Sequence, residues 1–398
     1  MASIHSIFAL SVLSIASASA AMHNLTSYGA GFLDPTIIPS AGGFAICIQG
    51  DIPVTASAQN VRLNYTEPAN QLSVTNTILE YLQANTTLPE TVLGTAANIS
   101  GTYNINSKLC LPSTQTANST TIQILTHGVA FDKSYWDFYS SDYSYVDAAA
   151  LAGYTTFSYD RLGNGKSSHP DPIQVVQTPL EKEILHELIQ MLRAGSIGAT
   201  AFENVVGVGH SFGSALTVSN TVDYPEDLDA AVLTGFSIDS SGKPVFVAGL
   251  GLDIAANNNP TRFGSLPNGY LISSTVSNNQ FGFFRAPNFD PLALWAAEAT
   301  KQTFALGELF TNSLLGGIAT KFTGPIDVVN GENDVPACNG NCLVPTNAAA
   351  AVIRALYPAA SNSSQYYTAP GTGHGLNLHF TAPVAYQHIL NFLAANNL

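Results

Sequence analysis

The chain of 398 residues predicts an α/β fold, and three segments carry this prediction. The apolar run 205–208 leads into Gly-His-Ser-Phe-Gly, after which small and apolar residues recur at helical spacing. The run 121–126 is followed at once by His-Gly-Val, and the run 156–159 enters a glycine-rich turn. Strands that end in tight turns, the first of them leading into a helix, are typical of an α/β sheet.

Ser211 stands at the apex of the turn that follows the run 205–208. Its neighbours Gly209 and Gly213 suit a strand-to-helix turn that leaves no room for side chains and strains the backbone at its apex. Such a turn lifts the serine hydroxyl clear of the sheet, with the free N–H groups of a helix N-terminus behind it. The pattern predicts that Ser211 is a nucleophile; the alternative is a buried glycine turn that packs a helix on a strand.

The three segments together resemble the α/β-hydrolase superfamily. His-Gly follows the run 121–126, Asp-Arg-x-Gly-x-Gly-x-Ser occupies 160–167, and the serine turn comes next, in the order and spacing of that superfamily over residues 120–240. The resemblance implies a mostly parallel, doubly wound sheet. It also implies that an acid and then a base follow Ser211 in the chain, since a serine hydroxyl alone is a weak nucleophile.

The resemblance places the acid just past a later strand, where Asp334 ends the segment 325–334. Glu332 and Asp327 are rivals for this role, although Asp327 sits inside the predicted strand. The structural alternative for Asp334 is an exposed turn aspartate. We expect Asp334 to fix the tautomer of the base and to stabilise its charged form.

The base is expected near the C-terminus, in the glycine-lined loop 371–375 that contains His374. His379 and His388 are competitors, but His388 lies in the amphipathic segment 385–393 and is interpreted as a helix-surface residue. In the implied mechanism His374 removes the proton of Ser211 and later delivers it to the leaving group.

The oxyanion donors that the resemblance implies are the backbone N–H groups of Val129 and Phe212. Val129 and Ala130 follow His-Gly here, so the longer glycine-rich oxyanion motif of many lipases is absent. Four neighbouring polar residues are expected to shape the loops rather than to catalyse: His127, Asp160, Arg161 and His210.

The N-terminal segment 1–21 is apolar, ends in small residues and predicts a secretory signal peptide, although it lacks a leading Lys or Arg. Charged residues make up only 10% of the chain, and no later apolar run is long and unbroken enough to span a bilayer. Six glycosylation sequons accompany this signal, and the composition favours a secreted glycoprotein of fungal type. The sequons begin at Asn24, Asn64, Asn85, Asn98, Asn118 and Asn362.

Four cysteines allow three disulfide pairings. We favour Cys47–Cys110 and Cys338–Cys342, because each pair joins residues within one region, and the second would pin the loop after Asp334. The Cys-x-x-x-Cys segment has no nearby histidines to complete a metal site, so we expect neither a metal nor another cofactor. The net charge of −14 argues against nucleic acid and anionic membranes as partners.

The rest of the chain divides into three parts. Residues 22–118 are expected to form an N-terminal extension that adds strands to the sheet, with a small separate module as the alternative. The core is expected at 119–237 and 323–398. The insert 238–322 occupies the position of the superfamily's cap.

The insert is rich in aromatic residues, and the helical pattern at 292–310 suits a helical cap. Most of these aromatics are expected to form the core of the cap. Ligand sites are mostly apolar, so a few of them are expected to line a substrate pocket, with Phe283 and Phe284 as candidates.

The leading hypothesis is a secreted serine hydrolase for carboxylic esters, or lactones, of small and moderately apolar molecules. Ser211 argues against epoxide hydrolases and dehalogenases, which carry an aspartate at this turn. A peptidase stays open because the insert offers Asp253, Glu298 and Glu308 to a substrate amine, and an acyltransferase would use the same triad. A catalytically inactive binding protein would usually have lost a triad member. Substrate, acyl length and oligomeric state are left open.

Overall fold

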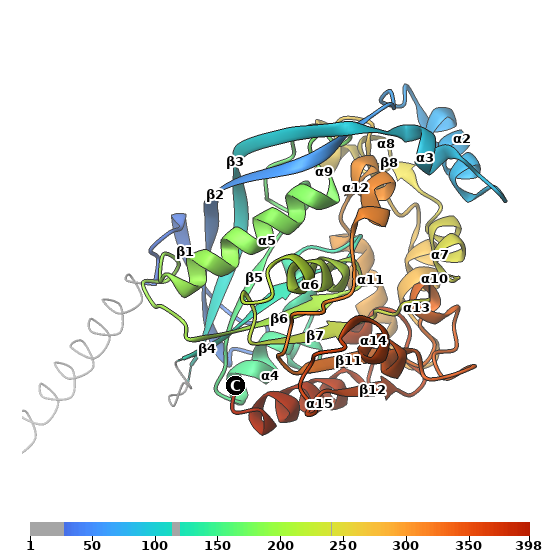
Figure 1. Cartoon of the computed structure of the whole chain (residues 1–398). Coiled ribbons are helices and arrows are strands. Elements are labelled where there is room, and N and C mark those ends of the chain that lie inside the picture. The colour runs from blue at the N-terminus through green and yellow to red at the C-terminus, as the bar shows by residue number, and fades with distance from the viewer. Residues whose placement is uncertain (1–27, 114–119, 240) are drawn as a thin grey trace, which may run out of the picture.

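A computed structural model describes residues 28–113, 120–239 and 241–398. The predicted signal peptide and the sequons at Asn24 and Asn118 lie outside the described residues. The central feature is a nine-stranded sheet with the strand order β1-β2-β3-β5-β4-β6-β7-β11-β12 (Figure 1). Its strands are β1 (Leu33–Pro39), β2 (Ala45–Leu63), β3 (Leu93–Pro112), β4 (Thr121–Thr126), β5 (Thr155–Tyr159), β6 (Asn204–His210), β7 (Ala230–Thr234), β11 (Ile326–Gly331) and β12 (Gln365–Ala369).

The six strands from β5 to β12 are parallel, as the sequence predicts. Neighbouring residues of β6 belong to different hydrophobic clusters, with Val205 in one and Val206 in the other, because successive side chains point to opposite faces of the sheet. Helices cover both faces, so strands such as β4 and β7 are buried along their whole length. The covering helices are α4 (Tyr145–Leu151), α5 (Thr178–Arg193), α6 (Phe212–Asp223), α14 (Ala348–Leu356) and α15 (Ala382–Ala395).

The N-terminal strands are antiparallel and belong to the same sheet, as expected for an extension that adds strands to it. β2 and β3 form a hairpin of 19 and 20 residues, and β3 pairs with β5 of the parallel region. The turn of this hairpin carries two helices, α2 (Gln71–Leu82) and α3 (Leu88–Val92). Both lie at the far end of the hairpin, beside the insert (Figure 1).

The insert is predominantly helical, but it also holds a three-stranded sheet that sequence periodicity did not predict. The expected helical pattern at 292–310 is interrupted, because the N–H of Gln302 donates to the carbonyl of Ala130 and residues 304–305 form a strand. The elements are α7 (Lys243–Leu250), β8 (Asp253–Ile254), α8 (Ala255–Asn258), α9 (Pro260–Phe263), β9 (Tyr270–Ile272), α10 (Val276–Phe283), α11 (Pro291–Thr300), β10 (Phe304–Ala305) and α12 (Leu306–Thr311).

None of the helices in the three described ranges has the length and hydropathy needed to cross a bilayer.

Candidate active site

The turn between β6 and α6 holds Ser211 in a conformation with φ 55° and ψ −115°. Positive φ is strained for a residue other than glycine and is often found where function requires it. The flanking glycines are required by space. A Cβ atom on Gly213 would stand 2.1 Å from the carbonyl oxygen of Thr126, and one on Gly209 would stand 2.5 Å from the Cα of Ser214. The close packing of helix on strand therefore presents the Ser211 side chain at the carboxyl end of β6.

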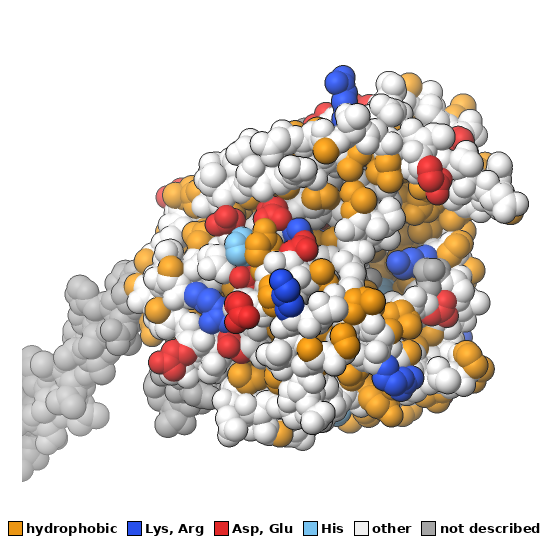
Figure 2. All heavy atoms as spheres, viewed as in Figure 1, with side chains coloured by type: hydrophobic (Ala, Val, Ile, Leu, Met, Phe, Trp, Pro, Cys, Tyr) orange, Lys and Arg blue, Asp and Glu red, His pale blue; other side chains and the backbone are white. Residues whose placement is uncertain are grey.

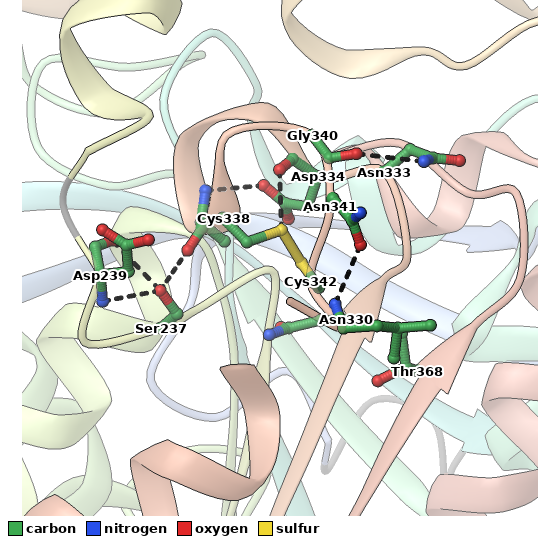
Figure 3. The surroundings of a disulfide bond; sticks show 12 residues. Ser237, Asp239, Asn330, Asn333, Asp334, Cys338, Gly340, Asn341, Cys342 and Thr368 are labelled. Atoms are coloured by element: carbon green, nitrogen blue, oxygen red, sulfur yellow. Dashed lines mark hydrogen bonds between the residues drawn. A yellow bond between two sulfur atoms is a disulfide. The ribbon is translucent and has the colours of Figure 1, made fainter. Parts of the chain in front are cut away.

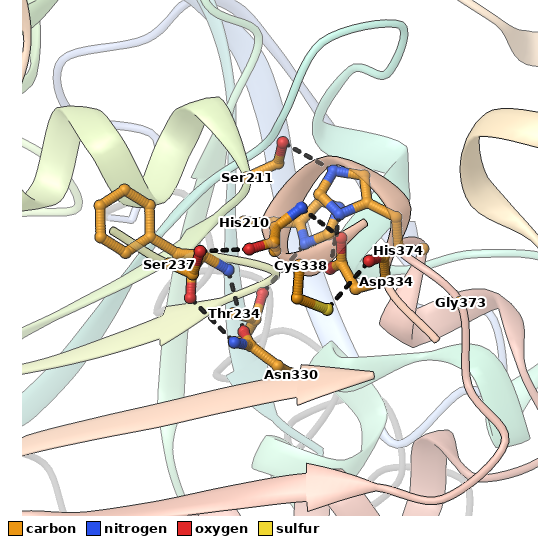
Figure 4. Close-up of polar contacts among 12 residues, drawn as sticks. His210, Ser211, Thr234, Ser237, Asn330, Asp334, Cys338, Gly373 and His374 are labelled. Carbon is orange, nitrogen blue, oxygen red and sulfur yellow. Dashed lines mark hydrogen bonds and ion pairs between the residues drawn. The ribbon is translucent and has the colours of Figure 1, made fainter. Parts of the chain in front are cut away.

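Ser211, His374 and Asp334 meet in the structure, although 163 residues separate the first two in sequence (Figure 4). The Ser211 Oγ lies 2.8 Å from Nε2 of His374, and Nδ1 of the same ring lies 2.8 Å from Oδ2 of Asp334. With Nδ1–H donating to the carboxylate, Nε2 is left as an acceptor for the serine hydroxyl. This arrangement can move a proton away from Ser211.

Asp334 is fully buried directly after β11, where it also caps the short helix α13 (Val335–Cys338). Its second oxygen, Oδ1, accepts from the N–H of Ala337 at 2.8 Å. The loop beyond it is closed by a disulfide between Cys338 and Cys342, and the N–H of Gly340 donates back to the Asp334 carbonyl (Figure 3). The acid is thus held from both sides of its own loop.

The two rivals of Asp334 for the role of the acid, Glu332 and Asp327, have other partners in the structure. The Glu332 carboxylate accepts from the N–H of Gly371 at 2.8 Å, which ties the acid loop to the loop that carries His374. Asp327 is buried inside β11 and lies 3.1 Å from Nε2 of His388. Neither carboxylate is bonded to His374.

The two rival bases also have structural partners. His379 accepts at Nε2 from the N–H groups of Gly373 and Arg285, its Nδ1 faces the carbonyl of Gly375, and burial lowers its pKa to about 4. It therefore organises the loop around His374. His388 is not the free surface residue that its amphipathic helix suggests, because it contacts Asp327 and its side chain is only 23% exposed.

His127 and His210 border the site and are both fully buried, which lowers their pKa values well below the ordinary value. The Nε2 of His127 accepts from the N–H of Arg161 at 2.9 Å. The ring of His210 stacks on Tyr135 and lies 5.0 Å from the ring of His374. Both are neutral supports of the loops, as their sequence positions indicate.

Two residues that line the cavity beside Ser211 have backbone N–H groups without a protein acceptor among the described residues. Val129 and Phe212 both border the cavity above the serine, and within the described part of the chain neither N–H donates to another protein group. Phe212 is the first residue of α6, where helical geometry leaves the N–H free. The sequence resemblance implies these two N–H groups as oxyanion donors, and that assignment stays a prediction.

A cavity of about 480 Å³ opens above Ser211 and His374. Its walls come from the insert, from the core and also from α2 and the loop after it, where Tyr81, Leu82 and Thr86 face the cavity. No sequence pattern predicts this N-terminal wall, because it forms only when the long hairpin brings α2 to the site. Hydrophobic side chains gather on the face where the insert and the hairpin helices approach each other (Figure 2).

The predicted pocket residues Phe283 and Phe284 do not line this cavity. Phe283 is buried behind it and stacks at 5.9 Å on His374, and Phe284 packs against Phe289 and His379. The aromatic rings that the insert presents to the cavity are Phe304 of β10 and Phe246 of α7, and the ring of Phe246 lies 5.6 Å from the ring of His374.

A buried charge cluster joins the core to the insert. Arg161 follows β5, and its Nη1 donates to Glu181 of α5 at 2.6 Å and to Glu308 of α12 at 2.5 Å. The guanidinium also lies 4.3 Å from the ring centroid of Phe212. All three charged side chains are almost completely buried, so the cluster fixes α12 against the core next to the cavity.

A family model described as the alpha/beta hydrolase family matches residues 123–386. Among solved structures, a thermophilic esterase from Thermogutta terrifontis has a TM-score of 0.50 at 13% identity, over 74% of this chain and 94% of that chain. The enol-lactonase from Burkholderia xenovorans LB400 has a TM-score of 0.46 at 15% identity, over 73% and 97%. Comparison with curated proteins gave no match. At such low sequence identity, the two solved structures show only that the fold is shared. The family model covers more than half of the sequence, so the chain belongs to the alpha/beta hydrolase family.

Proposed function

We propose that the protein is a secreted serine hydrolase that cleaves carboxylic esters or lactones of small, moderately apolar molecules through an acyl-enzyme on Ser211. One observation carries the proposal. The Ser211 hydroxyl is hydrogen-bonded to the buried His374–Asp334 pair and faces a largely apolar cavity. Nucleophile, base and orienting acid are the three parts that this chemistry needs.

In the proposed reaction His374 takes the proton of Ser211 as Oγ attacks the carbonyl carbon of the ester. The tetrahedral oxygen receives hydrogen bonds from the N–H groups of Val129 and Phe212, and each such donor typically lowers the barrier by about 2.7–4 kcal/mol. His374 then gives its proton to the leaving alcohol, and a water molecule, activated by the same histidine, releases the acid from Ser211.

The carboxylates of the insert support an ester rather than a peptide substrate. A peptidase would need one of them for a substrate amine, but each already has protein partners. Glu298 binds Lys301 and Asn279, and Asp253 accepts from Ser274 and Asn258. Glu308 borders the cavity, yet its oxygens accept from Arg161 and from the N–H of Ala305.

The proposal includes secretion and glycosylation. Two disulfides, Cys47–Cys110 and Cys338–Cys342, suit an oxidising compartment. All four sequon asparagines that fall within the described ranges are exposed and accessible to a glycan: Asn64, Asn85, Asn98 and Asn362.

The proposed function predicts a covalent fluorophosphonate adduct at one residue, Ser211. The secreted protein and its Ser211→Ala variant are treated with the probe, digested and analysed by mass spectrometry. A single adduct on the Ser211 peptide, absent from the variant, together with hydrolysis of p-nitrophenyl esters by the wild type, is the expected result. A well-folded protein that forms no adduct and hydrolyses no ester would contradict the proposal.

The two disulfides are expected to affect different properties. Serine in place of Cys338 and Cys342 should lower the free energy of unfolding by about 2 kcal/mol, because the closed loop is short, and should lower kcat because the Asp334 loop is released. Serine in place of Cys47 and Cys110 should cost about 4 kcal/mol with kcat retained, since 63 residues separate that pair. Urea unfolding and ester hydrolysis measure both. Equal kcat values in the two variants would argue against a positioning role for the shorter loop.

A further inference from the structure

The helix α7 presents one face to the cavity, and one position on that face is a lysine. Lys243, Phe246, Val247 and Leu250 all border the cavity, at the i, i+3, i+4 and i+7 spacing of a single helical stripe. Three of the four are apolar, as expected for a wall of a largely apolar site. Lys243 lies one turn before Phe246, and the ring centroid of Phe246 is 5.6 Å from that of His374. A cation therefore stands on the wall that leads to the candidate nucleophile.

Lys243 is the only Lys or Arg that borders the cavity in the described part of the chain. Two carboxylates border the same space. Glu308 is held by Arg161, and Asp239 accepts from the N–H of Ser241 at 2.8 Å. No carboxylate of the described residues forms an ion pair with Lys243, although most other lysines around the core do: Lys108, Lys133, Lys182 and Lys301.

The Lys243 side chain is exposed on the wall of the cavity, where an anionic group of a substrate can reach it. The side chain keeps access to solvent, yet neighbouring atoms remove enough water to lower the pKa of its ammonium group. A partly desolvated cation gains more from an opposite charge than a fully hydrated one. The protein as a whole carries a net charge of −14, so an anion is attracted only locally, where an unpaired cation such as Lys243 is near.

We propose that Lys243 binds a carboxylate of the substrate, so that the preferred esters carry an anionic group some bonds away from the carbonyl that Ser211 attacks. This inference rests on the proposed ester hydrolysis at Ser211 and names its substrate class. Lys243 is a binding residue and takes no part in proton transfer. The apolar stripe of Phe246, Val247 and Leu250 contacts the carbon chain of the same substrate.

The test compares two p-nitrophenyl esters with acyl chains of equal length, the hexanoate and the adipate monoester, which differ in a terminal methyl or carboxylate. The wild type is expected to prefer the carboxylate-bearing ester. Lys243→Met should lower the ratio of the two kcat/KM values about tenfold, as expected for a charged hydrogen bond, and Lys243→Glu should lower it further. The hexanoate has no charge for Lys243 to bind, so each variant's own hexanoate kcat/KM is the reference, and a general change in turnover cancels in the ratio.

A second pair of esters identifies which side of the substrate carries the anion. Phenyl butyrate and para-carboxyphenyl butyrate, followed by acid release at constant pH, place the carboxylate on the alcohol side. If the alcohol side carries the anion, the preference of the wild type and its loss in the variants appear in this pair instead of the first. Raising the salt concentration should reduce that preference in the wild type and leave Lys243→Met unaffected.

The control variant is Lys321→Met. Lys321 is exposed and precedes β11, at the end of the strand opposite to Asp334, so this change should leave both ratios unaltered. Unchanged ratios in both Lys243 variants, with hexanoate turnover retained, would overturn the inference and leave the proposed function standing. A wild type that hydrolyses none of the four esters and forms no fluorophosphonate adduct would overturn both.

Discussion

An Asp334→Asn variant is expected to lose about four orders of magnitude in kcat toward a p-nitrophenyl ester while folding like the wild type. The carboxylate accepts from Nδ1 of His374 at 2.8 Å and stabilises the ring when it becomes charged. An asparagine of the same shape can present its N–H₂ group to Nδ1, which favours the tautomer that carries the proton on Nε2. That tautomer cannot accept the Ser211 proton. Steady-state kinetics with a neutral ester measure the loss.

The two rival acids supply matched controls of the same chemistry. Glu332→Gln and Asp327→Asn should each retain kcat within about tenfold, because their carboxylates contact Gly371 and His388 rather than His374. Circular dichroism and thermal unfolding show whether each variant is folded. A folded Asp334→Asn enzyme with near wild-type kcat, or a collapse of kcat in Glu332→Gln alone, would remove Asp334 from the proposed triad.

The parts of the site that sequence predicts are those set by local geometry. The turn at 209–213 requires glycine where the backbone of α6 meets the β4 strand, so its pattern is visible in five residues. His374 and Asp334 follow strands of the parallel sheet, and the carboxyl ends of such strands meet at one edge. Chain order and strand ends, interpreted through the resemblance to the superfamily, were therefore enough to single out the three residues.

The walls of the cavity depend on contacts that no local pattern records. Tyr81 and Leu82 reach the site because the β2–β3 hairpin extends beyond the sheet, and Gln71 bonds to the backbone of residues 252 and 254 in the insert. The sheet of the insert has strands of two and three residues, too short to show alternation. The aromatic content of the insert makes Phe283 a candidate for the pocket. In the structure, however, the course of the insert places its ring behind His374, outside the cavity.

The second large effect that we expect is on stability, and it concerns the buried cluster of Arg161, Glu181 and Glu308. Arg161→Met should lower the free energy of unfolding by about 3–5 kcal/mol, because it leaves the buried Glu308 carboxylate without its cation and the buried Glu181 side chain without its hydrogen-bond donor. Glu308→Gln should also lower the free energy of unfolding, since it leaves Glu181 as the only acidic partner of the guanidinium and loosens α12 at the edge of the cavity. Urea unfolding of the purified variants provides the measurement.

The neutral variant Glu181→Gln separates charge pairing from shape. Burial, with the nearby Glu308 carboxylate adding to it, raises the pKa of Glu181 well above its usual range. Between the ordinary pKa of the unfolded chain and this raised value, the folded protein binds a proton that the unfolded chain releases. A group with a raised pKa stabilises the folded state below the unfolded pKa, and this contribution is lost as the pH rises toward the folded value.

Glutamine carries its N–H₂ group at all pH values and can donate to Glu308 in place of that proton. Glu181→Gln should thus unfold with nearly the wild-type free energy at pH 4.5 and become the more stable of the two as the pH rises. Arg161→Met should be less stable than the wild type across the same range. If Glu181→Gln is instead as unstable as Arg161→Met at every pH, Glu181 is ionised in the folded protein, and the cluster needs both carboxylates to balance a single guanidinium.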